Sequence, residues 1–190
     1  MGLCYKITLD NICATKGWGA IATHWCTDVT MRNCHVGRAD YHYGVYGVNV
    51  VENCSFISYP CKIEIGYGDG TVIVRDSIFY KRIEGSIYSN DFIQCRNDFA
   101  IMFSGKLIFD NVTVQLFDYD PSRNNYSWLL TYRTGDYNNE LLEWAPNNFP
   151  YVSINNLLVR AENTADVDKL QLIGIYSSYT GENVRHMSIG

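Results

Sequence analysis

Apolar and polar residues alternate in six short segments that share one pattern around a central asparagine or aspartate. The segments are residues 7–14, 29–36, 49–56, 72–79, 107–114 and 152–159, and their central residues are Asn11, Asn33, Asn53, Asp76, Asn111 and Asn156. In each segment the positions two before, one after and three after the centre are apolar or small, as in Met31, Cys34 and Val36. Alternation with a period of two on both sides of a bend predicts two short β-strands that share one interior.

Charged residues occupy the position just before the centre. This column reads Asp10, Arg32, Glu52, Arg75, Asp110 and Asn155. Equivalent residues of neighbouring coils in a parallel stack lie about 4.8 Å apart, and like charges directly opposite each other are destabilising. Because the first five members alternate in sign, the column predicts a ladder of opposite charges on the outside of the stack.

The central asparagine has a conformational role. Asparagine tolerates the left-handed backbone region and hydrogen-bonds to its own backbone, so six in register predict a sharp corner. Successive centres are 22, 20, 23, 35 and 45 residues apart. The shorter spacings fit one bare coil of a stacked repeat, and the two longest must hold insertions.

These patterns predict an all-β fold, a parallel β-helix (solenoid) with irregular loop insertions in its second half. We expect a single domain over residues 1–190, with regular coils over about 5–80, enlarged coils over about 81–160 and a last partial coil over about 161–190. Because a solenoid needs capping elements and neither end offers an obvious one, we expect a fragment of a longer chain, or ends covered by partners. A β-sandwich is the alternative fold, but it does not explain a fixed anchor residue with agreement in every column.

Composition and charge argue against a nucleic-acid-binding protein and against a membrane protein. Apolar residues make up 47% of the chain, and the formal net charge is −5 with no concentrated basic stretch, so we expect no nucleic-acid partner. No apolar run approaches the length of a transmembrane helix, so no membrane partner is expected either. The first residues lack the basic start and apolar stretch of a signal peptide.

The cysteines and histidines give no clear sign of a metal. The seven cysteines form no CxxC pair and mostly lie in or beside apolar runs, which favours buried thiols in a chain that folds in a reducing cytosol. A disulfide framework or a zinc site is the alternative. No pair of the four histidines has metal-ligand spacing, and we expect no cofactor. A serine or cysteine nucleophile paired with a histidine stays open, because such partners meet only in the folded chain.

The apolar-x-apolar-x-Asn-apolar-x-apolar pattern, repeated across residues 5–160, resembles the pectin-lyase-like family of right-handed parallel β-helices. Within that family the chain is most similar to bacteriophage tailspike or appendage proteins, because it has long insertions and no signal peptide. This resemblance implies a homotrimer at the virion or extracellular surface, in contact with other virion proteins, that binds and often cleaves bacterial surface polysaccharide. A fold alone does not fix function. A structural spacer of a virion appendage and a secreted polysaccharide lyase or glycoside hydrolase therefore stay open.

Carboxylates in the enlarged intervals are the candidates for catalysis. The chain lacks the Gly-His-Gly and Asp-Asp motifs of polygalacturonases. Glycoside hydrolysis requires two carboxyl groups across the scissile bond. The preferred candidates are Asp118, Asp120, Glu140 and Glu143, with Asp69, Asp91 and Asp98 as further ones. No pair is singled out, and a solvated loop carboxylate is the alternative for each.

Aromatic residues carry the clearest indication of a ligand. The chain has fifteen tyrosines and four tryptophans. Aromatic rings pack on the apolar faces of sugars, while tyrosine hydroxyls can bind sugar hydroxyls. The predicted ligand-binding residues are Tyr119, Tyr126, Trp128, Tyr132, Tyr137 and Trp144. The alternative is that these rings line the interior or a subunit interface, where Tyr and Trp are also enriched.

Overall fold

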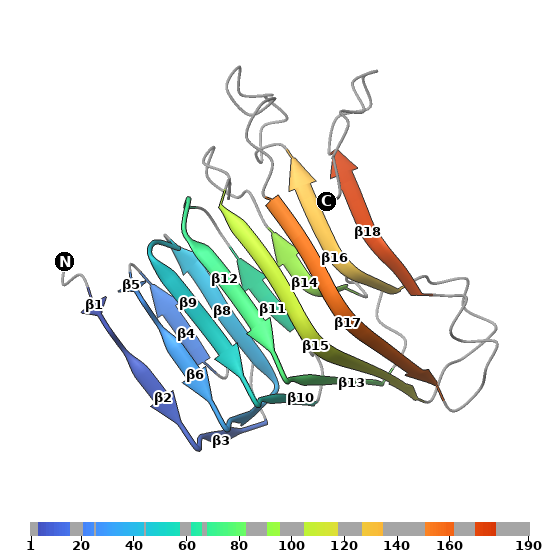
Figure 1. The fold of residues 1–190 in the computed structure, drawn as a ribbon, viewed down its shortest axis with the longest axis horizontal. Coiled ribbons are helices and arrows are strands. Elements are labelled where there is room, and N and C mark those ends of the chain that lie inside the picture. The colour runs from blue at the N-terminus through green and yellow to red at the C-terminus, as the bar shows by residue number, and fades with distance from the viewer. Residues whose placement is uncertain are drawn as a thin grey trace.

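A computed structural model describes residues 4–15, 21–24, 26–43, 45–57, 62–65, 68–82, 91–95, 105–117, 127–134, 151–161 and 170–177. These residues form β-strands without a helix, and all the strand pairings are parallel. The strands stack coil upon coil in a curled, solenoid-like arrangement, and the chain advances steadily along the stack (Figure 1). The prediction of an all-β fold built from parallel strands is confirmed.

Each coil has two legs that meet at the central Asn or Asp, followed by a strand in a separate sheet. The two legs are separate strands in the first four coils and halves of one continuous strand, β15 or β17, in the last two. The first leg consists of β2 (Thr8–Asp10), β6 (Thr30–Arg32), β9 (Val48–Glu52), β12 (Thr71–Arg75) and the starts of β15 (Lys106–Phe117) and β17 (Tyr151–Ala161). The second leg consists of β3 (Cys13–Ala14), β7 (His35–Val36), β10 (Ser55–Ile57), β13 (Ile78–Arg82) and the ends of β15 and β17.

The remaining strands form two further sheets. A six-stranded sheet, here the third sheet, contains β4 (Ile21–His24), β8 (Arg38–Tyr43), β11 (Lys62–Ile65), β14 (Asp91–Cys95), β16 (Ser127–Thr134) and β18 (Leu170–Ser177). The short strands β1 (Cys4–Tyr5) and β5 (Cys26–Thr27) pair with each other ahead of the first leg.

The predicted apolar columns form the interior. Met31, Val51, Val74 and Phe109 stand in register in the column two before the centre, and each is at most 1% exposed. In the column three after the centre, the rings of Phe56 and Phe79 stack with their centroids 4.6 Å apart. A fully buried side chain of this kind contributes about 1.5–3 kcal/mol to stability, so the stacked columns account for much of what holds the coils together.

The predicted corner is present at all six central residues. Their φ angles lie between 50° and 57°, in the left-handed region. The backbone N–H of each of Asn11, Asn33, Asn53 and Asp76 donates to the carbonyl of the residue before the centre in the next coil. The corners are therefore locked to one another along the stack.

The charge ladder is present as two ion pairs. Arg32 pairs with Asp10 at 2.9 Å, and Arg75 pairs with Glu52. In both cases the guanidinium Nε and Nη2 face the carboxylate of the preceding coil. Each of these arginines thus faces an opposite charge in the preceding coil, which is part of the ladder that the sequence predicted.

A second corner, which the sequence pattern did not predict, stands ahead of the first leg. Lys6, Asp28 and Gly47 have φ angles of 54°, 56° and 66°. Asn49, in the otherwise apolar interior column that follows, is fully buried. Its Oδ1 accepts from the Val29 N–H at 3.1 Å and its Nδ2 donates to the Tyr46 carbonyl at 3.0 Å, so it ties two coils together at this corner.

Candidate functional site

The predicted site residues fall mostly in segments beyond the described part of the chain. These are Asp118, Tyr119, Asp120, Tyr126, Tyr137, Glu140, Glu143 and Trp144. Two of the predicted aromatics, Trp128 and Tyr132, belong to β16 in the third sheet. The predicted catalytic and ligand-binding roles of all ten residues stay predictions.

The register of β16 bears on its two aromatic positions. Tyr132 pairs with Cys95, and Cys95 pairs with Ile65, which is fully buried. Trp128 pairs with Asp91 on one side and Gln171 on the other. Tyr132 thus occupies a register column that also contains an interior residue, whereas the column of Trp128 contains polar residue types.

The in-register stack gathers the ends of the enlarged segments. The chain leaves the third sheet after Cys95 and after Thr134, and it re-enters the first leg at Lys106 and Tyr151. Cys95 pairs with Tyr132, and Lys106 pairs with Tyr151. Segments 96–104 and 135–150 therefore begin and end at neighbouring positions, although they are far apart in the sequence.

The two groups of predicted carboxylates attach to opposite ends of β16. Asp118 and Asp120 precede Ser127, where the strand begins, and Glu140 and Glu143 follow Thr134, where it ends. Eight residues at about 3.3 Å per residue separate these ends by roughly 23 Å. Catalytic carboxyl groups lie about 5–9.5 Å apart. A catalytic pair of Asp118 with Asp120, or of Glu140 with Glu143, therefore fits this distance more readily than a pair with one member from each end of β16.

The central asparagines form a polar ladder on the exposed corner. Nδ2 of Asn33 donates to Oδ1 of Asp10 at 3.0 Å, and Nδ2 of Asn53 donates to Oδ1 of Asn33 at 2.7 Å. The hydrogen bond from Asn33, together with that from Arg32, holds the pKa of Asp10 below its ordinary value. Side chains that are hydrogen-bonded to one another in this way stabilise the stack and have fewer polar groups left to bind a substrate.

His35 and Ser55 make the closest approach to a catalytic pair among the described residues. His35 Nδ1 lies 2.5 Å from Ser55 Oγ, across the exposed face of β7 and β10. A serine nucleophile also needs a third group that orients the histidine. Among the side chains that the structure describes, no carboxylate is hydrogen-bonded to His35, so this contact is a cross-strand hydrogen bond.

Small polar side chains lie beneath the asparagine corner. The thiols of Cys34 and Cys54 and the hydroxyl of Ser77 donate to the backbone carbonyl two residues earlier, at 3.1, 3.2 and 2.8 Å. Burial raises the pKa of the Cys54 thiol to about 11. A thiol held in the protonated form is a poor nucleophile, so Cys54 has a structural role. Cys4, Cys13, Cys34 and Cys54 are free thiols.

The described residues contain no group of three or more His, Cys, Asp or Glu side chains that could hold a metal ion. Within the same residues, no helix is long and apolar enough to cross a membrane.

Comparison of the chain with protein-family models, with curated proteins and with solved structures found no match.

Proposed function

We propose that this chain is part of a right-handed parallel β-helix that recognises bacterial surface polysaccharide, as the tailspike or appendage proteins of bacteriophages do. The parallel stack, the left-handed corner at each central residue and the resemblance of the repeat support this proposal. Under this proposal, the first leg, the second leg and the third sheet close around one interior. The protein then works as a homotrimer at the virion or extracellular surface.

The observation that carries the proposal is that segments 96–104 and 135–150 begin and end at neighbouring positions of the stack. Segment 135–150 holds Tyr137, Glu140, Glu143 and Trp144, which are residue types that suit a sugar ligand. Residues that bind ligands are often found on loops positioned by a rigid scaffold. An extended polymer that binds at these positions would contact several coils at once.

Binding to polysaccharides tests the proposal. The purified chain is incubated with capsular, O-antigen and teichoic polysaccharides immobilised on beads, and retention is measured. Retention on at least one polysaccharide supports the proposal. Absence of retention across the panel contradicts it and favours a structural spacer.

Analysis of the soluble products then separates a binder from an enzyme. New reducing ends indicate a glycoside hydrolase and unsaturated products indicate a lyase, and either would implicate the carboxylates Asp118, Asp120, Glu140 and Glu143. Retention with no product supports binding alone. Light scattering tests the homotrimer, and a monomer would contradict the tailspike assignment.

A further inference from the structure

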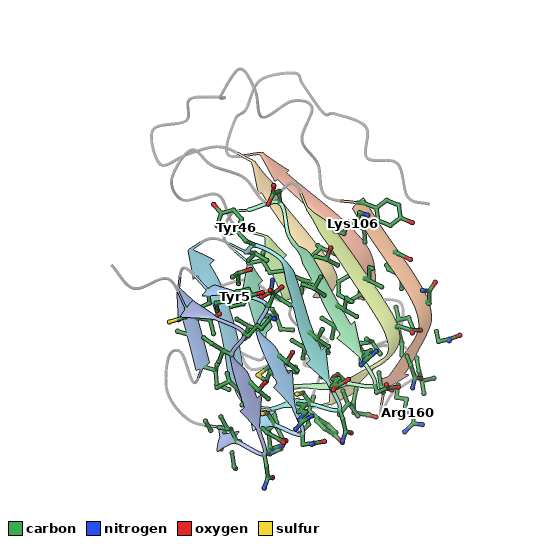
Figure 2. The ribbon with its side chains drawn as sticks, turned by 60° about the vertical axis from the view of Figure 1, so that its left-hand side comes forward. Tyr5, Tyr46, Lys106 and Arg160 are labelled. Atoms are coloured by element: carbon green, nitrogen blue, oxygen red, sulfur yellow. The ribbon has the colours of Figure 1, made fainter. Side chains whose placement is uncertain are left out.

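Three exposed tyrosines and a lysine stand along the edge of the stack near the start of the first leg. Tyr5, Tyr46 and Tyr151 are 60%, 41% and 52% exposed, and the Lys106 side chain is also exposed. We name this set (Tyr5, Tyr46, Lys106 and Tyr151) the tyrosine edge. Figure 2 shows Tyr46 and Lys106 at the same end of the strands, and Arg160 at the far end.

The register orders these residues along the axis of the stack. Tyr5 and Tyr46 both pair with Thr27, from opposite sides, so two steps separate them, or roughly 10 Å. Lys106 pairs directly with Tyr151, one step or about 4.8 Å away. The row thus consists of two neighbouring columns. Tyr5 and Tyr46 lie in one of them, and Lys106 and Tyr151 lie in the other, which also contains Val48 and Thr71 and stands two residues further along the coil.

The backbone under this row is rigid. Gly70 donates to the Val45 carbonyl at 3.0 Å, and Lys106 and Tyr151 donate to the carbonyls of Gly70 and Gly105 at 2.9 Å each. The coils approach so closely here that a Cβ on Gly105 would lie 1.8 Å from the Gly70 carbonyl oxygen. A ligand that binds this edge would therefore lose little free energy to ordering the protein.

The polar groups of the row are available for a ligand. Lys106 forms no ion pair or hydrogen bond through its side chain within the described part of the chain, and the neighbouring Asp69 is exposed. The Lys6 ammonium lies 5.0 Å from the centroid of the Tyr5 ring and covers one face of it. Tyr46 and Tyr151 are accordingly the principal platforms.

From these contacts we infer that the tyrosine edge is a docking site for an extended polysaccharide, an inference that rests on the proposed function and gives it a location. Aromatic faces receive the apolar C–H faces of sugar rings, and the tyrosine hydroxyls, the Lys106 ammonium and the Asp69 carboxylate bind sugar hydroxyls. Tyrosine is also enriched in protein interfaces, but lysine and aspartate are depleted there, so Lys106 and Asp69 favour a sugar ligand over a protein partner. The enlarged segment 135–150 ends at Tyr151, so the edge continues directly into the predicted ligand-binding region.

Variants of the two principal platforms test this inference. Tyr46→Ala and Tyr151→Ala, singly and together, are compared with Leu158→Ala, an exposed apolar side chain on the second leg. Retention is measured by affinity electrophoresis in gels that contain the capsular, O-antigen and teichoic polysaccharides. The double variant should lose at least tenfold in apparent affinity for any polysaccharide that retains the wild-type chain, while Leu158→Ala should be unchanged. Lys106→Gln should weaken retention several-fold, whereas the matched Arg160→Gln should not.

Wild-type retention that the double variant keeps in full overturns the docking site and leaves the proposed function standing. Absence of wild-type retention overturns both. Hydroxyl-radical footprinting of the wild-type chain in the presence of the same polysaccharides gives a second test that does not depend on how well a variant folds. Protection of Tyr46 and Tyr151 without protection of Leu158 supports the inference, and equal labelling with and without polysaccharide contradicts it.

Discussion

Individual residues set the corners of this stack through backbone conformation. An ordinary L-residue in the left-handed region costs roughly 1–2 kcal/mol, and Asn and Asp visit that region because their short side chains hydrogen-bond locally. The asparagine corner therefore relieves strain and at the same time supplies the amides that bond from coil to coil. Asn53 performs both roles, with φ of 50° and a 2.7 Å hydrogen bond to Asn33.

Substitution of Asn53 separates these two roles. Asn53→Ala should lower the free energy of unfolding by about 2–3 kcal/mol, because it loses the hydrogen bond and adds strain. Asn53→Gly relieves the strain but adds unfolded-state entropy, and it should cost about 1.5–2 kcal/mol. Urea unfolding monitored by circular dichroism measures both values. An alanine variant no less stable than the glycine variant would refute the strain argument.

The Asp10 carboxylate makes the stability of the first coils depend on pH. Because hydrogen bonds from Asn33 and Arg32 lower its pKa in the folded state, its contribution is present above its ordinary pKa. That contribution is lost as the pH falls through the lower, folded-state pKa. Asp10→Asn should therefore flatten the decline of the unfolding midpoint below about pH 4, relative to the exposed control Asp69→Asn. Parallel acid profiles for the two variants would show that Asp10 makes no such contribution.

At the scale of elements, the asparagine ladder is interrupted between Asn53 and Asp76. Asn111 Nδ2 donates to Asp76 Oδ1 at 2.7 Å, but an ionised Asp76 carboxylate has no hydrogen to donate to the preceding Asn53. Asn53 and Asp76 have the same left-handed backbone conformation, each with a φ of 50°. The side chains are thus placed for a hydrogen bond that the carboxylate cannot make.

Asp76→Asn should complete the ladder. The new amide can accept from Asn111 and donate to Asn53, which should raise the free energy of unfolding by about 0.5–1 kcal/mol. Asp76→Ala is the matched control and should be destabilising, because it removes the acceptor and the tolerance of positive φ. Equilibrium unfolding at neutral pH measures the difference. A less stable asparagine variant would mean that the carboxylate charge beside Arg75 outweighs the missing hydrogen bond.

The sequence predicted the first corner and the interior because the same residue types recur at one phase of every coil. It did not predict the second corner, since Lys6, Asp28 and Gly47 share a backbone conformation without sharing a residue type. The burial of Asn49 could not be predicted from the sequence either. Its hydrogen-bond partners are backbone groups of Val29 and Tyr46, which come together only when the coils stack.

At the scale of the whole molecule, stacking of the coils places residues that are distant in the sequence beside one another. The sequence alone could identify single aromatic clusters, but not a row made from Tyr5, Tyr46 and Tyr151, because the different coil lengths hide their alignment. The pairings of Thr27 with Tyr5 and Tyr46, and of Lys106 with Tyr151, place these residues in two neighbouring columns. The second column contains Val48, two residues after Tyr46, because Thr71 pairs with both Val48 and Lys106. A polymer is the natural ligand for such a row, since it can contact several coils.

Surface plasmon resonance with the immobilised wild-type chain tests polysaccharide recognition most directly. Capsular, O-antigen and teichoic polysaccharides are passed over the surface in turn, and circular dichroism verifies that the chain is folded. We predict saturable binding to at least one of these polysaccharides. A folded chain that binds none of them would contradict the proposed function.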